Sequence, residues 1–152
     1  MSRRGRPVGR MGGGTLVEFA LVAPLMILLI MAALEMSILF WVGLTLQHAV
    51  REGARYAVTG QGGALRDQLA VQRIVEQSMG LYQRVQPVLY INRATAPADP
   101  AHIAPGMLGA GGELLLLQLD GAWPVASPLL QPWLGTVYHF RVAATMRNEA
   151  FE

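Results

Sequence analysis

Apolar residues dominate the N-terminal third of the chain in one long run. Between Phe19 and Leu46 the only ionisable side chain is Glu35. A helix rises about 1.5 Å per residue and the hydrocarbon core of a bilayer is about 30 Å thick, so the run is longer than one membrane crossing requires. The pattern predicts a single membrane-spanning helix that begins near Gly14 and is kinked or loosened at Pro24.

The helical pattern continues beyond the apolar run, but on one side only. Small and apolar residues recur at a spacing of three or four: Leu46, Ala49, Val50, Gly53, Ala54 and Ala57. Arg51, Glu52 and Arg55 fall on the other side, which is typical of an amphipathic helix. The glycine-rich residues 60–63 then predict an end at about Thr59.

Past these glycines the pattern predicts one more helix and then strands. Residues 64–79 carry apolar pairs at helical spacing. Three strands are predicted at 88–91, 113–120 and 136–147. In the last of them the apolar face is formed by Tyr138, Phe140, Val142, Ala144 and Met146. The Pro- and Gly-rich residues 95–112 and 123–135 predict loops, the second with a short helical turn at most.

The expected fold class is therefore α+β, with a pilin-like arrangement. A long N-terminal transmembrane helix, extended by its amphipathic part, and a short second helix cover one face of a small antiparallel three-stranded sheet. The expected division of the chain is a basic cytoplasmic leader (1–13), the transmembrane helix with its amphipathic extension (14–59) and a periplasmic α+β domain (60–152).

Charge orients the predicted helix. Hydrophobic residues make up 53% of the 152-residue chain and charged residues 14%, against about 25% charged in typical soluble domains. Arginines 3, 4, 6 and 10 precede the apolar run with no acid among them, whereas arginines and acids balance from residue 47 onward. The basic tail predicts a cytoplasmic N-terminus. A nucleic-acid-binding surface is not expected, because the folded part has no basic excess.

Two other interpretations of the sequence find little support. A secretory signal peptide has a shorter apolar core that ends at an Ala-x-Ala site, which is missing here. The three histidines, at positions 48, 102 and 139, have no metal-type spacing, and the chain has no Cys. Nucleophile-elbow and phosphate-loop motifs are also missing from the sequence. We expect neither an enzyme nor a cofactor.

Two carboxylates lie in the apolar segment. Burial of Glu35 as an ion would cost a few kcal/mol by insertion scales. Either it lies near the outer membrane interface, or it contacts another helix inside an assembly. Glu18 lies in the first turns of the helix, where a carboxylate complements the helix dipole. Farther along, Arg51, Glu52 and Arg55 form either an inter-subunit ion-pair set or a solvated helix face.

Three blocks of the sequence resemble the TadE-like family, the pseudopilins of the tight-adherence (Flp, type IVc) pilus system. The first is Gly-Gly-Thr-Leu-Val-Glu-Phe-Ala-Leu at 13–21, followed by Pro24. The second is Leu34-Glu35 together with residues 49–57, Ala-Val-Arg-Glu-Gly-Ala-Arg-Tyr-Ala. The third, near the C-terminus, consists of Arg147, Asn148, Glu149 and Phe151, with Ala150 where the family more often has Pro. For 147–149, a helix-docking role and a plain polar end are both open.

The resemblance implies processing by a membrane aspartyl prepilin peptidase. A cut between Gly13 and Gly14 would make Glu18 the fifth residue of the mature chain and Phe19 the sixth, as in the family's motif. This cut removes the four arginines of the tail. Our hypothesis is that Glu18 then pairs with the new α-amino group of a neighbouring subunit, neutralising two charges that are costly in a low-dielectric environment.

The resemblance implies a membrane-anchored assembly component, a pseudopilin or minor pilin of a Flp-type pilus used for surface adherence and biofilm formation. Its expected partners are the prepilin peptidase, other pilins and pseudopilins, inner-membrane platform proteins and the bilayer. Its expected location is the bacterial inner membrane, with entry into the filament left open. The alternative is a signal-anchored periplasmic scaffold or binding module of a secretion or envelope complex that is not processed.

Overall fold

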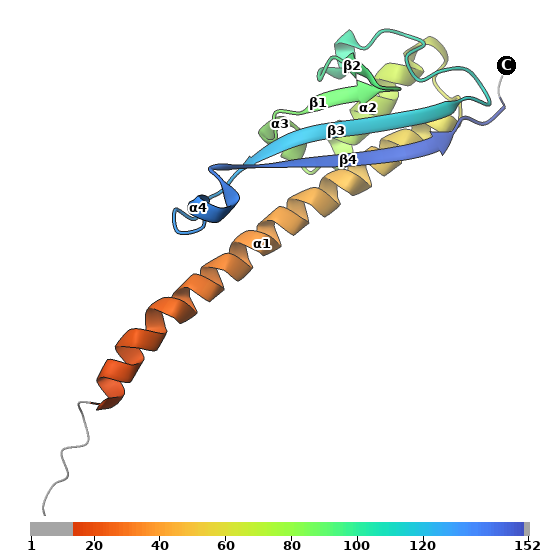
Figure 1. Cartoon of the computed structure of the whole chain (residues 1–152). Coiled ribbons are helices and arrows are strands. Elements are labelled where there is room, and N and C mark those ends of the chain that lie inside the picture. The colour runs from red at the N-terminus through yellow and green to blue at the C-terminus, as the bar shows by residue number, and fades with distance from the viewer. Residues whose placement is uncertain (1–13, 151–152) are drawn as a thin grey trace, which may run out of the picture.

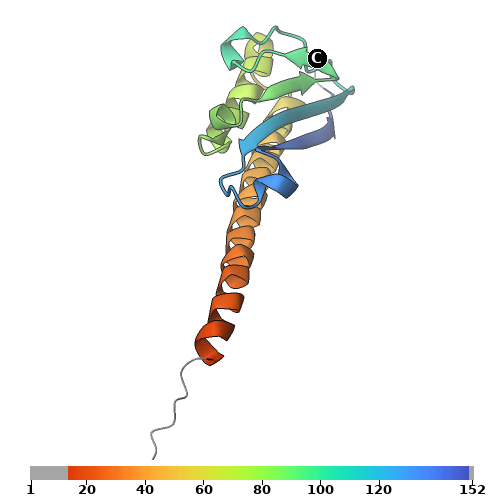
Figure 2. The same cartoon turned by 60° about the vertical axis from the view of Figure 1, so that its left-hand side comes forward.

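The molecule consists of one long helix with a small α+β domain at its C-terminal end. The computed structural model describes residues 14–150 (Figure 1). The helix α1 (Gly14–Val58) runs through Pro24 without a break. Its N-terminal half projects away from every other element in both views (Figure 2). The predicted start near Gly14 coincides with the first described residue and stays a prediction, and the helix ends one residue before the predicted Thr59.

The second helix is shorter than predicted. A 3₁₀ turn (Gly63–Leu65) precedes α2 (Arg66–Gln77), and the short α3 (Leu81–Arg84) follows. Both ends of the predicted 64–79 helix were wrong. At the start, residues 64 and 65 belong to the 3₁₀ turn, and Leu65 (φ −95°, ψ 1°) lies outside α-helical geometry. At the end, positive φ angles at Met79 and Gly80 break the helical backbone. The face of α2 that packs inward consists of Ala70, Val71 and Ile74.

The sheet has four strands, so the prediction of three was wrong. They are β1 (Val88–Ile91), β2 (Ala94–Ala96), β3 (Leu114–Pro124) and β4 (Val137–Arg147). Their order is β2-β1-β3-β4, and each neighbouring pair is antiparallel.

The missed strand, β2, is joined to β1 by a two-residue turn. Asn92 and Arg93 have φ angles of 49° and 70°, and a two-residue type I′ hairpin turn requires positive φ at both central positions. Glycine is usual at the second position, so Arg93 concealed the hairpin. The three residues of β2 are also too short a run for an alternating pattern.

The strand β3 is longer than its apolar run suggested. It pairs with β4 from Leu114 opposite Arg147 to Pro124 opposite Val137. The predicted strand 113–120 and the predicted irregular segment from Trp123 therefore had the wrong boundary. Pairing with β4 extends the strand, and Pro124 is tolerated because it stands at the strand's last position. The predicted short helical turn is present as α4 (Gln131–Leu134).

The core lies between one face of the sheet and the two helices. All six small and apolar residues of the predicted amphipathic face, from Leu46 to Ala57, are buried. They meet Leu115, Leu117 and Leu119 of β3, which alternate with less buried residues as a half-buried strand requires. At Gly53 the two helices approach so closely that an added Cβ would contact the Ala70 carbonyl oxygen at 2.8 Å and the side chain of Ile74.

Candidate assembly surface

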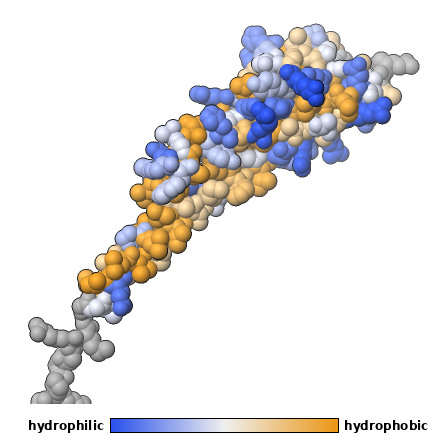
Figure 3. Space-filling model, in the orientation of Figure 1, coloured by the Kyte–Doolittle hydropathy of each residue, from blue (hydrophilic) through white to orange (hydrophobic). Residues whose placement is uncertain are grey.

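The first 21 residues of α1, numbers 14–34, form an apolar stalk. The stalk contains no buried residue, and most of its large side chains are more than half exposed. Figure 3 shows this apolar surface continuing up to the domain. At about 1.5 Å per residue the stalk is about 32 Å long, close to the hydrocarbon thickness of a bilayer. The helix has the length and hydropathy of a membrane span, so the protein is membrane-anchored.

The proposed processing motif lies at the N-terminal end of the stalk. Gly14 is exposed, and so are Glu18 and Phe19 one turn later. Gly13 lies outside the described residues. The pairing of Glu18 with an α-amino group of another subunit stays a prediction. The exposure of its side chain is what such a pairing requires.

Glu35 is the first buried residue of α1, with 4% of its surface exposed. Its carboxylate accepts hydrogen bonds from the backbone N–H groups of Ala126 (3.0 Å) and Ser127 (3.1 Å), in the loop after β3. Neither interpretation of the sequence included this contact, because it joins residues 91 and 92 positions apart. A contact of Glu35 with another helix in an assembly stays a prediction.

The polar face of the outer helix turns away from the core. Arg51 and Arg55 are exposed and Glu52 is half-buried. None of the three side chains forms a hydrogen bond or ion pair with another described residue. Glu52 and Arg55 border a depression of about 220 Å³ beside Tyr56. Both interpretations of this set, an inter-subunit ion-pair set and a solvated face, therefore stay open.

The C-terminal motif docks on the end of α1. The side chain of Asn148 is buried and donates hydrogen bonds to the carbonyl oxygens of Leu108 (2.9 Å) and Ala110 (2.8 Å). The backbone N–H of Glu149 donates to the carbonyl oxygen of Val58 at 2.9 Å. These contacts favour the helix-docking interpretation over a plain polar end. Phe151 lies outside the described residues.

Arg147, like Glu149, is an exposed member of this motif. Its Nε donates a hydrogen bond of 2.9 Å to the carbonyl oxygen of Gly112, in the turn before β3. The turn is also held through its own backbone, since the Gly112 N–H lies within hydrogen-bond distance of the carbonyl oxygens of Asn148 and Glu149. The end of β4 and the start of β3 are thereby tied together.

Two charged residues at the start of α2 were not predicted as important. Asp67 is buried and accepts hydrogen bonds from the backbone N–H groups of Leu108 (2.7 Å) and Gly106 (3.0 Å). Arg66 is also buried, and it donates to the Leu108 carbonyl oxygen at 3.2 Å. In the sequence Asp67 is a first-turn helix acid, a position that an exposed residue occupies equally well. The sequence around Asp67 therefore does not distinguish a buried first-turn carboxylate from an exposed one.

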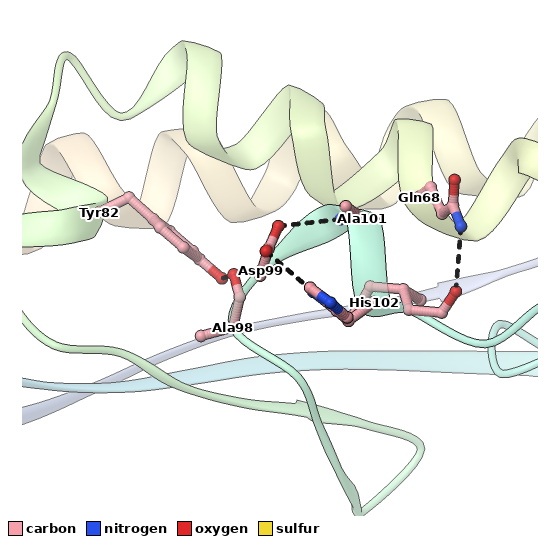
Figure 4. A network of polar contacts seen from close by, with 7 residues as sticks. Gln68, Tyr82, Ala98, Asp99, Ala101 and His102 are labelled. Atoms are coloured by element: carbon pink, nitrogen blue, oxygen red, sulfur yellow. Dashed lines mark hydrogen bonds and ion pairs between the residues drawn. The ribbon is translucent and has the colours of Figure 1, made fainter.

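A second group of polar contacts fixes the adjoining residues 98–103 (Figure 4). Tyr82 donates a hydrogen bond to the carbonyl oxygen of Ala98 at 2.8 Å. Burial, and secondarily the negative charge of Asp99, raises the pKa of Tyr82 to about 12. The carboxylate of Asp99 accepts from the N–H of Ala101 and contacts Nδ1 of His102 at 2.9 Å. These bonds, the backbone one first, lower the pKa of Asp99. The contact gives His102 a role in holding this loop.

An apolar groove continues the exposed surface of α1 onto the domain. It lies between α1 and β4 and has a volume of about 270 Å³. Phe40 and Leu44 of the helix line it on one side, and Tyr138 and Phe140 of β4 on the other. Tyr138, predicted on the inward face of its strand, stays 39% exposed because this end of β4 borders the open groove.

Comparison with known proteins supports the resemblance over the helix. The family model described as "TadE-like protein" matches residues 13–55. That segment reaches almost to the end of α1, and it includes both the proposed processing motif and the polar set on the outer helix. No curated protein and no solved structure matches the chain.

Proposed function

With a TadE-like segment forming its membrane anchor, we propose that the chain is a pseudopilin or minor pilin, an assembly component of a Flp-type pilus. It acts in surface adherence and biofilm formation without catalysing a reaction or holding a cofactor. Its partners are the prepilin peptidase, other pilins or pseudopilins, and the platform proteins of the inner membrane. It lies in that membrane with its N-terminus in the cytoplasm and its domain in the periplasm.

The observation that carries this proposal is where the family match begins. The match starts at residue 13, the glycine that precedes the proposed cut, and the residues after the cut are helical from the first described one, Gly14, to Val58. A cut between them leaves a mature chain whose α-amino group stands at the first residue of an apolar helix. The same cut removes the four arginines, which keep the N-terminus of the uncut chain in the cytoplasm.

The exposed apolar side chains of the stalk can be covered either by lipid or by other subunits. Its side chains are covered by lipid while the protein is anchored, and stalks of neighbouring subunits would cover them in a filament. The desolvated charges of Glu18 and of a neighbour's α-amino group offset each other in that setting. The neighbouring subunit is thus recognised by charge at the helix end and by apolar surface along the rest of the stalk.

Intact mass measurement tests the proposal. The full chain is purified from membranes with and without a co-expressed prepilin peptidase. The expected result is loss of residues 1–13 only when the peptidase is present, and no loss in a Gly13→Leu variant, whose bulky side chain blocks the cut. If the chain were uncut in both conditions, this proposal would be wrong, and the alternative of an unprocessed periplasmic scaffold would take its place.

The role of Glu18 requires a separate experiment. Glu18→Gln keeps the shape of the side chain and removes its charge. We expect processing or pilus formation to fail, with Glu76→Gln, an exposed residue of α2, as a matched control for loss of one carboxylate. If Glu18→Gln left both processing and pilus formation intact, the pairing hypothesis would be wrong.

A further inference from the structure

The loop that carries α4, residues 125–136, differs in composition from the rest of the domain. Between Asp120 and Arg141 the sequence contains no Asp, Glu, Lys or Arg. Two large apolar side chains of this loop project into solvent: Leu129 is 53% exposed and Trp133 is 72% exposed. No Asp, Glu, Lys or Arg lies near these two side chains along the sequence, so an apolar environment can accept this part of the loop.

The position of the loop along α1 indicates what that contact is. The bonds from Ala126 and Ser127 to Glu35 tie the loop to α1 one residue beyond the stalk. Since the stalk is about as long as the hydrocarbon core is thick, Glu35 lies at the outer boundary of that core. Within the domain, α4 is the element nearest to the N-terminal half of α1 (Figures 1 and 2).

The helix itself remains apolar on its outer surface for two more turns. Phe40 is 65% exposed and Trp41 is 49% exposed. Trp41 is about 9 Å beyond Glu35 along the helix, and the headgroup layer on each side of the core is about 5–8 Å thick, so Trp41 stands at the outer edge of that layer. Tryptophan is enriched in this interfacial layer. The loop, which is attached at Glu35, therefore stands at the inner edge of this layer.

The backbone of the loop is suited to a poorly hydrated layer. Unpaired N–H groups are costly there, and most of those in the loop have acceptors. The Glu35 carboxylate accepts two of them, from Ala126 and Ser127, and Pro128 and Pro132 have none to satisfy. Backbone carbonyl oxygens accept those of Val125, Leu130, Trp133, Leu134 and Gly135.

We propose that residues 125–136 form a second membrane contact, in which Leu129 and Trp133 insert into the outer phospholipid interface beside the transmembrane helix. Glu35 is the positioning residue, because its carboxylate holds the loop at the depth of that interface. The two attachments together fix the orientation of the domain relative to the bilayer. This inference depends on the membrane anchor and not on a pilus role, so it is tested apart from processing.

Fluorescence quenching in phosphatidylcholine vesicles tests the contact with the full chain. Trp41→Phe and Trp123→Phe leave Trp133 as the single tryptophan. Lipids with bromine near the headgroup end of the acyl chains are expected to reduce its emission by about half or more, and lipids with bromine near the methyl end to reduce it less. Aqueous acrylamide should quench it weakly.

A matched control places a tryptophan at the opposite end of β3. Leu114 is 69% exposed, similar to Trp133, and it stands at the end of the strand away from α4. In a chain that lacks the three native tryptophans, Leu114→Trp should be quenched by acrylamide and not by brominated lipid. If Trp133 behaved as this control does, or were shielded from both quenchers by protein, the membrane contact would be refuted.

The positioning role is tested by Glu35→Gln in the chain with Trp133 alone. The amide has one acceptor oxygen where the carboxylate has two, so one of the two loop bonds is lost. Acrylamide quenching should rise and lipid quenching should fall. If acrylamide quenching and lipid quenching were both unchanged, the role assigned to Glu35 would be wrong. Far-ultraviolet circular dichroism checks that the variant is folded.

Discussion

The backbone N–H of Glu149 donates a hydrogen bond of 2.9 Å to the carbonyl oxygen of Val58, the last residue of α1. The last carbonyl groups of a helix have no acceptor role within the helix, so they need donors from elsewhere. Here the donor comes from the residues that follow β4. The long helix and the C-terminal end of the sheet are therefore joined at one point, and Asn148 buries its side chain beside that junction.

Asn148→Ala should destabilise the domain by about 1–3 kcal/mol, since the carbonyl oxygens of Leu108 and Ala110 lose a buried donor. Thermal unfolding of the full chain in detergent, followed by circular dichroism, measures the change. Glu149→Ala is the control: its bond to Val58 comes from the backbone and is retained, so its midpoint should stay close to that of the unmodified chain. Equal effects of both variants would contradict this account of the motif.

Gly53→Ala should destabilise the packing of α1 against α2 by about 1–3 kcal/mol, because the added methyl group overpacks a closed contact with Ala70 and Ile74. Gly43→Ala in the same helix is the control, since nothing lies within 4 Å of its added Cβ. There the higher helix propensity of alanine should leave stability unchanged or raise it by up to about 1 kcal/mol. Unfolding midpoints of the two variants in one detergent should therefore move in different directions.

Glu35→Gln should speed hydrogen exchange at the amides of Ala126 and Ser127 by on the order of tenfold or more, since a bond to a charged acceptor contributes about 1.5–3 kcal/mol. Exchange measured by nuclear magnetic resonance or mass spectrometry on the micelle-bound chain gives the rates. In the Glu18→Gln control, the carboxylate removed is on the exposed stalk, and exchange in the loop should not change. Protection that persisted in Glu35→Gln would show that other contacts hold this loop.

Tyr82 should ionise only as the pH approaches about 12, because burial and the charge of Asp99 disfavour its phenolate. Its folded pKa lies above the unfolded value of about 10, so above pH 10 the unfolded chain releases this proton first. The free energy of unfolding should therefore fall as the pH rises from about 10 to 12. Absorbance at the phenolate band should show a delayed step that Tyr82→Phe removes and Tyr138→Phe leaves in place.

Periodicity alone predicted the elements whose burial depends on one continuous face. The outer part of α1 has apolar residues every three or four positions, and each of those between Leu46 and Ala57 is buried. The alternation of β4 is likewise confirmed at Val142 and Ala144. Such patterns predict burial well because helix and strand each impose a fixed spacing on the side chains that face the core.

Element boundaries depended on partners and were predicted less well. The extension of β3 to Pro124 follows from its pairing with β4, and the strand β2 depends on positive φ at Asn92 and Arg93. Neither has a strong local signal. A proline at a strand end and an arginine in a tight turn are both uncommon choices, and β3 holds the turn through the hydrogen bonds between Asn92 and Leu116.

By itself, the sequence determined the anchor, its charge asymmetry, the α+β class and the resemblance of its first helix, because each is written in residues that are neighbours along the chain. Only the tertiary structure decided which polar groups are buried. Glu35 meets Ser127, Asp67 meets Leu108 and Val58 meets Glu149 across separations of 92, 41 and 91 residues. A carboxylate on a helix has the same local pattern whether water or a distant backbone N–H satisfies it, so folding alone distinguishes the two.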